Sequence, residues 1–142
     1  NWIKRGWVAN PKDKRYGEVQ LARIILINMV RDVLPLEMIA EIMSVVNGSV
    51  ELREDDMLPD RDWYNLLCRC IFEFEDTACK PSNYDERLTH VISRVLAEYT
   101  PVTEDERKTL YHVLFIMVNA YEASAMKKNA FNEWNIMMRR NF

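Results

Sequence analysis

Apolar residues recur at spacings of three and four along most of the chain, which is the period of an amphipathic α-helix. The pattern predicts helices over residues 18–33, 35–46, 61–76 and 84–99, and a fifth that begins near Thr103. The predicted core positions are Val19, Ala22, Ile25 or Leu26, Met29, Val33, Leu36, Ile39, Ile42, Met43, Val46, Trp63, Leu66, Leu67, Cys70, Ile71, Phe74, Leu88, Val91, Ile92, Val95, Leu96, Tyr99, Leu110, Val113, Leu114, Met117, Val118 and Tyr121.

Several residue pairs mark the expected helix ends. Asn47 and Gly48 tolerate positive φ and therefore indicate a helix stop. Thr103 with Glu106 forms a capping-box pattern at the start of the last helix. Because no Gly or Pro follows Val102, residues 103–142 form either one long helix or two helices broken near residues 127–131.

A helix of that length cannot hide all its apolar surface on a body this small. Two arrangements remain open: the helix pairs with a second chain, giving a homodimer, or it folds back onto its own domain. The acidic stretch "SVELREDDMLPDRD" lies before the third helix. We expect an exposed connector at residues 49–60, which separates a front portion (1–48) from a helical bundle (61–142) that dimerises or senses.

The composition fits an all-α protein with few turns. Only 3 Gly and 5 Pro occur among 142 residues. The longest apolar run, residues 24–30, is far shorter than the ~20 residues that span a bilayer and is flanked by Arg23 and Arg31. The chain starts with Asn and shows no signal peptide, so we expect the ordered part of a longer cytoplasmic protein, with reduced cysteines and no membrane partner.

Charge is distributed unevenly. Residues 1–34 carry seven Lys and Arg against three Asp and Glu, whereas the remaining 108 carry twelve against nineteen, for a net charge of −3. A basic front on an acidic body indicates an anionic partner for the front, although a solvated terminus is the alternative. The order of parts in the front is a short helix end stopped by Gly6, a basic loop turned at Asn10-Pro11, and then two helices.

These residues carry a resemblance to a known family. The run "WIKRGWV…PKDKRY…QLARI…VLPLEMIAEIM" resembles the winged helix-turn-helix of MerR-type transcription regulators, and is closer to an uncharacterised bacterial branch, a domain of unknown function with that helix-turn-helix. In this comparison residues 6–8 match the Gly-Leu-Ile ending of the recognition helix, and Arg15-Tyr16 match the end of the wing. Residues 35–39 match Ser-Leu-Glu-Glu-Ile. The resemblance covers residues 1 to about 48.

The resemblance implies a MerR-like winged helix-turn-helix, partial at its N-terminus, in a DNA-binding regulator of transcription. Double-stranded DNA would be the partner, and phosphates would be contacted by Lys4, Arg5, Lys12, Lys14 and Arg15. The wing is shorter than usual and lacks its Gly, and the base-reading residues would precede Asn1. We expect Trp2 and Trp7 to pack the wing against the following helix rather than to stack on bases.

Chemical sites are not expected. Cys68 and Cys70 lie two residues apart on a helix and point about 200° apart, so with Cys79 and His90 they do not form a zinc pattern. His90 and His112 lie beside apolar stripes, and no nucleophile elbow, paired-carboxylate signature or nucleotide loop accompanies them. We therefore expect neither an enzyme, nor a metal, nor a cofactor.

Two other functions remain open. The first is a protein–protein adaptor that uses the helix-turn-helix shape or the long last helix. The second is a helical sensor that binds a small apolar effector among the aromatic residues of the later helices. These residues are Trp63, Phe72, Phe74, Tyr84, Tyr99, Tyr111, Phe115 and Tyr121. A closed apolar cavity would favour the sensor.

Overall fold

The computed structural model describes residues 3–4, 8–10, 17–48, 56–77 and 83–140. They form the helices α1 (Glu18–Val30), α2 (Leu36–Asn47), α3 (Asp60–Asp76), α4 (Tyr84–Glu98) and α5 (Glu104–Arg140). Since these ranges contain no strand, the predicted all-α class is confirmed for the part of the chain that is described. None of the described helices is both long enough and apolar enough to cross a membrane.

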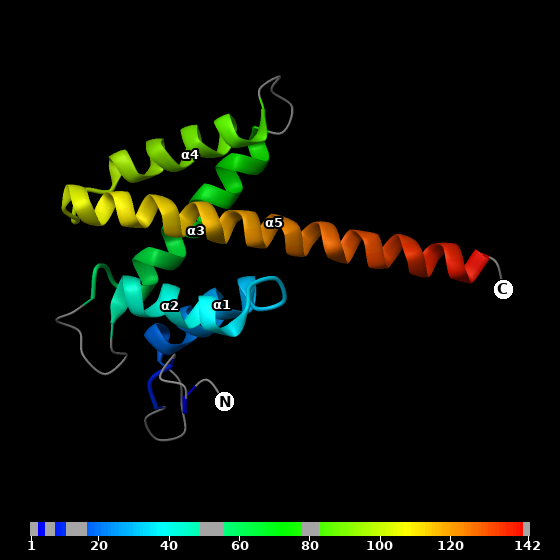
Figure 1. The fold of residues 1–142 in the computed structure, drawn as a ribbon, viewed down its shortest axis with the longest axis horizontal. Helices are drawn as coiled ribbons and strands as arrows, with labels where there is room; N and C mark the ends of the chain where they lie inside the picture. Colours follow the sequence, from blue (N-terminus) through cyan, green and yellow to red (C-terminus); the bar gives the residue numbers. More distant parts are fainter. Residues whose placement is uncertain (1–2, 5–7, 11–16, 49–55, 78–82, 141–142) are drawn as a thin grey trace.

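The helices pack around the N-terminal half of α5. Figure 1 shows α4 along one side of this half, α3 crossing it, and α1 with α2 on the opposite side from α4. Both α1 and α4 contact α3 and α5, and α3 contacts α5. The C-terminal end of α5, red in Figure 1, extends beyond all the other helices. The last helix therefore runs on past the body instead of folding back onto it.

One hydrophobic core joins the front of the chain to the later helices. Its buried side chains come from all five helices and from Val8 and Leu58. Every predicted core position of α3 is buried, and so are those of α4 except Tyr99 and those of α5 except Tyr121. The predicted division into residues 1–48 and 61–142 stays a prediction, but its two parts share this core.

The prediction for α1 was partly wrong. The helix ends at Val30, three residues earlier than expected, and Val33 is exposed in the following turn. The buried apolar residues are Ala22, Leu26, Ile27 and Val30. In a helix that is apolar nearly all round, periodicity alone does not settle which side turns inward, and packing against α3 and α5 decides it.

Local sequence explains several helix ends. Gly48, at the end of α2, has a positive φ of 38°, as the Asn-Gly stop predicted. The Asn83 side chain accepts a hydrogen bond from the Glu86 amide at 2.8 Å at the start of α4. The predicted capping box of α5 is confirmed, because Thr103 Oγ1 accepts from the Glu106 amide and the Glu106 carboxylate accepts from the Thr103 amide.

The expected connector is described only from Asp56 onward. In that part Leu58 and Asp60 are 2% exposed, and the Met57 amide donates to the Val46 carbonyl at 3.0 Å. The end of the stretch expected to be exposed therefore belongs to the core. An acidic, proline-containing sequence did not reveal that one carboxylate has a buried cationic partner on α1.

Candidate nucleic-acid interface

The basic front is anchored to the body at its described positions. Ile3 packs against the core and Val8 is 2% exposed, while Lys4 beside Ile3 is exposed to solvent. The side-chain amide of Gln20 in α1 donates to the Asn10 carbonyl at 3.3 Å. Apolar contacts and this hydrogen bond thus hold the described residues of the front against α1 and the core.

Four of the five predicted phosphate-contacting residues, Arg5, Lys12, Lys14 and Arg15, lie outside the described residues, as do Trp2, Trp7 and the predicted wing tip. Lys4 is described, and it forms a turn with Ile3 where a helix end was expected. Lys4 as a whole is exposed. The predicted grouping of five cations on one face therefore stays a prediction.

A buried polar cluster joins the front to α3. Arg23 Nη1 donates to Asp60 Oδ1 at 3.0 Å, and the Asn47 side-chain amide donates to the same oxygen at 2.8 Å. The Asn47 side-chain oxygen in turn accepts from the Leu58 amide at 3.4 Å. Arg23, Asn47 and Asp60 are all 3% exposed or less, so α1, α2 and α3 meet at one desolvated ion pair.

The cluster changes the charge available in the front. Arg23 counts among the seven cations of residues 1–34, but it forms a buried ion pair with Asp60 and does not add to the surface charge. The sequence hid this role, since an arginine inside a helix of mixed pattern usually points to solvent. The buried contact fixes the orientation of α1, the helix that follows the basic front.

A second contact holds the turn between α1 and α2. The Ser124 hydroxyl of α5 donates to the Asp32 carboxylate at 2.8 Å. This hydrogen bond, and then Lys127 and Lys128 nearby, lower the pKa of Asp32 below its usual value. The two front helices are therefore tied to α3 through Arg23 and to α5 through Asp32.

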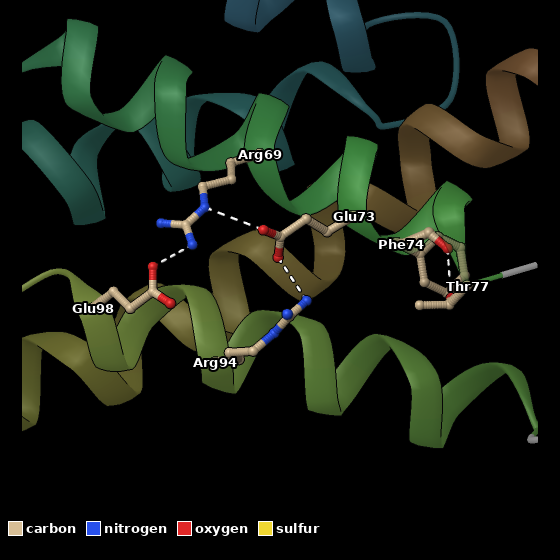
Figure 2. A network of polar contacts seen from close by, with 6 residues as sticks. All are labelled: Arg69, Glu73, Phe74, Thr77, Arg94 and Glu98. Carbon is tan, nitrogen blue, oxygen red and sulfur yellow. Dashed lines mark hydrogen bonds and ion pairs between the residues drawn. The ribbon is translucent and has the colours of Figure 1, made fainter.

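An exposed charge network lies between α3 and α4 (Figure 2). Arg69 bridges Glu73 of its own helix and Glu98 of α4, and Arg94 donates to Glu73 at 2.8 Å. Hydrogen bonding to Glu98 is the main cause of the raised pKa of Arg69. Since these opposite charges satisfy one another, the network clamps two helices and leaves no unbalanced charge for a ligand.

The candidate metal and redox residues that the structure describes are Cys68, Cys70, His90 and His112. Cys70 is fully buried, and burial raises the pKa of its thiol to about 12. Cys68 is half-buried beside Tyr64, and Cys79 lies outside the described residues. His90 and His112 are exposed on α4 and α5. Among the described residues no group of three or more His, Cys, Asp or Glu could hold a metal ion.

The carboxyl groups of Glu75 in α3 and Glu122 in α5 lie close together, which the hydrophobic pattern of the sequence did not predict. Burial, followed by a hydrogen bond with Glu75, raises the pKa of Glu122 to about 7. One Glu122 oxygen is buried and has no hydrogen-bond partner among the described residues. Glu122 and Glu75 lie on neighbouring helices far apart in sequence, so only tertiary packing reveals their proximity.

The aromatic residues considered for an effector are spread over different environments. Trp63 and Phe74 are core residues, Phe72 is 75% exposed, and Tyr84 packs edge-on against Phe74. Two grooves lie along α1: one of about 520 Å³ against α5, lined by Ile25, Met29 and Tyr121 among others, and one of about 410 Å³ against α3. Both are open to solvent, unlike the closed cavity that a sensor would favour.

Comparison with known proteins adds one match. No curated protein and no solved structure matches the chain. A family model described as a domain of unknown function (DUF1836) matches residues 1–66. The matched stretch includes α1, α2, the start of α3 and the whole Arg23–Asn47–Asp60 cluster. Residues 1–66 of this chain are thus similar to that domain of unknown function.

Proposed function

We propose that the protein is a DNA-binding regulator of transcription, and that its basic front contacts the phosphates of duplex DNA through Lys4, Arg5, Lys12, Lys14 and Arg15. The observation that supports this proposal most is the uneven distribution of charge along the chain. Residues 1–34 contain seven Lys and Arg, although the net charge of the whole chain is −3. A cationic segment neutralises phosphates and releases their counterions, which favours binding without reading sequence.

The anchoring of the front supports this proposal over a merely solvated terminus. Ile3 packs against the core on one side of Lys4, and the buried Val8 follows soon after. Arg23 is buried with Asp60, so the cations proposed for DNA do not include it. A front held in place loses less conformational entropy on binding than a free tail does.

The MerR-like winged helix-turn-helix is part of the same proposal. Two described features agree with it: α1 and α2 follow each other through a short turn, and they form the core together with α3. In such an arrangement α1 carries the wing at its N-terminal end. The DUF1836 match over residues 1–66 treats the front, α1 and α2 as parts of one unit.

The test uses the full chain and two matched double variants. In Lys14→Ala with Lys12→Ala, two cations of the front are lost; in Lys127→Ala with Lys128→Ala, two exposed cations of α5 are lost. Duplex binding is measured by fluorescence anisotropy against salt concentration. We expect the front variant to weaken binding and to reduce the slope of log affinity against log salt by about two, because each phosphate contact contributes about 0.9.

The control distinguishes the front from any other positive surface. The α5 variant removes the same amount of charge, so it should leave the slope nearly unchanged. Equal losses in the two variants would show that only overall charge matters. A loss confined to the α5 variant would assign DNA binding to α5 and contradict the proposal.

A protein–protein adaptor is the second candidate, and one observation favours it. Large apolar side chains are exposed on the C-terminal half of α5, including Met126 at 64% and Phe131 at 59%. Soluble proteins expose such groups together mainly where another surface covers them. An adaptor would bind a partner protein equally well after the Lys12 and Lys14 substitutions.

A further inference from the structure

Helices α1 and α5 contact each other and form a groove along their junction. The α1 wall consists of Ile25, Asn28 and Met29, which are three and four residues apart and therefore lie on one face of the helix. The α5 wall runs along one face from Tyr121 to Asn132. We call this the α1–α5 groove. Its volume of about 520 Å³ lies within the roughly 300–1,000 Å³ that ligand-binding sites have.

The floor of the α1–α5 groove is largely apolar. It is formed by the half-buried residues Ile25, Met29, Tyr121 and Ala125. Both walls are present from Ile25 to Met29, over about 6 Å at about 1.5 Å per residue, which is room for one aliphatic side chain. The α5 wall continues from Tyr121 to Asn132, over about 16 Å. An extended chain of about five residues, at about 3.3 Å per residue, has that length.

Three side-chain carboxamides line the rim of the α1–α5 groove. Asn28 belongs to α1, Asn129 and Asn132 belong to α5, and all three are exposed. Each carboxamide offers N–H donors and an oxygen acceptor, which are the groups that a peptide bond carries. Asn is a weaker helix former than Ala, Lys or Glu, so these residues do not stabilise the helices that carry them. Their chemistry points to a polar, uncharged ligand.

The charge along the groove agrees with an uncharged ligand. Lys128 is the charged residue among the described residues of its walls. Ser124, also in the α5 wall, donates to the Asp32 carboxylate at 2.8 Å, and after this hydrogen bond the nearby Lys127 and Lys128 lower the pKa of Asp32. An ionised carboxylate therefore opposes Lys128. A nucleic acid would need a surplus of cations, which these walls do not offer.

We propose that the α1–α5 groove binds an extended peptide segment of a partner protein. One aliphatic side chain of the segment lies on the floor, between Ile25 and Met29 of α1 and Ala125 of α5. The backbone of the segment runs along α5 and exchanges hydrogen bonds with Asn129 and Asn132. An extended chain presents N–H and C=O groups on both sides without internal partners, so carboxamides on both walls can satisfy them.

Two other occupants fit this groove less well. A helical segment satisfies its own backbone groups, so the carboxamides would find no partner along its backbone. A saccharide packs its rings against flat aromatic faces, whereas Tyr121 is the single aromatic residue among the described residues of the lining. The proposal does not rest on DNA binding, because the residues that carry it differ from the five cations assigned to DNA.

The first experiment titrates the isotope-labelled full chain with the capped peptide acetyl-Gly-Ser-Leu-Ser-Gly-amide and follows the side-chain NH2 signals of Asn129 and Asn132 by NMR. We expect saturable shifts, and binding about tenfold weaker or more when Gly replaces the central Leu. N-methylation of the Leu amide should weaken binding about threefold or more, because it removes one hydrogen-bond donor. Absence of shifts, or equal binding of the N-methylated peptide, overturns the proposal. Shifts caused by maltotriose and by none of the peptides would assign the groove to a saccharide and overturn it as well.

The second experiment removes both carboxamides of the α5 wall, in Asn129→Ala with Asn132→Ala. Since Ala is the better helix former, this variant should fold at least as well as the wild type. We expect it to weaken binding of the Leu peptide by about tenfold, as for two lost hydrogen bonds, measured through the side-chain signal of Asn28. The matched control is Asn135→Ala, which removes an exposed carboxamide of α5 beyond the end of the wall. Unchanged affinity in the double variant, or the same loss in the control, overturns the proposal.

Discussion

Removing the Asp60 carboxylate should be among the most destabilising single changes in the front of this protein. Asp60→Ala removes the buried carboxylate that accepts from both Arg23, which is 3% exposed, and the Asn47 side-chain amide. Breaking a buried ion pair from one side costs about 3–5 kcal/mol, because the remaining charge stays desolvated. A domain of ordinary stability has about 5–15 kcal/mol in total.

The assay is urea unfolding followed by circular dichroism, with thermal unfolding alongside. We expect Asp60→Ala to lower the free energy of unfolding by about 3–5 kcal/mol and Tm by roughly 10 °C or more. Glu18→Ala provides a control that joins the same two helices, since Glu18 pairs with Arg61 of α3 at 3.4 Å, with both side chains more than 60% exposed. Its cost should stay below about 1 kcal/mol.

A double substitution separates the cost of breaking the ion pair from one side from the cost of lost packing. Replacing both members, as in Arg23→Met with Asp60→Leu, removes both charges while keeping most of the volume, so it should be much less harmful than Asp60→Ala alone. If Asp60→Ala costs less than about 1 kcal/mol, or if the double variant is the less stable protein, the reasoning on this cluster is refuted.

Two further predictions concern titrating groups in the helical body. The pKa of the Glu122 carboxyl is raised to about 7, mainly by burial, so this group binds its proton more tightly in the folded than in the unfolded chain. The free energy of unfolding should therefore fall as pH rises from about 4.5 to 7. Glu122→Gln should remove this loss and gain roughly 1 kcal/mol at pH 8 in urea unfolding, after allowance for solvent screening. An unchanged pH profile in that variant would contradict the assignment. The Cys70 thiol, with a pKa raised to about 12 by burial, should stay protonated, so that iodoacetamide at pH 8 labels it at least about a thousandfold more slowly in the folded chain than in urea, as measured by peptide mass mapping. Rapid labelling of Cys70 in the folded chain would show that α3 is not packed as described.

Periodicity in the sequence was sufficient for the later helices. In α3 every predicted core residue is buried, since its apolar positions occupy one side and charged residues occupy the other. The capping box at Thr103 and the stop at Gly48 were also confirmed, because both depend on residues close together in the chain. Local chemistry acts over a few residues, and the sequence displays it directly.

Tertiary pairing was not predictable in the same way. Arg23 and Asp60 are 37 residues apart in the sequence. The pattern indicated that Asp60 lies in an exposed connector and that Arg23 only flanks an apolar run. The carboxyl pair of Glu75 and Glu122 was missed for the same reason. For α5, the pattern predicted the length and the surplus of apolar surface but left open whether the helix breaks or folds back. The structure settles both points, with a continuous helix that leaves the body.

The measurement that tests the central claim most directly is the salt dependence of duplex DNA binding by the full chain. Five phosphate contacts from the basic front predict a slope of log affinity against log salt of about −4 to −5. A salt dependence of that slope would support the claim that the basic front contacts DNA phosphates while it is held against the helical body. A full chain that shows no affinity for duplex DNA at low salt, or an affinity insensitive to salt, would contradict it.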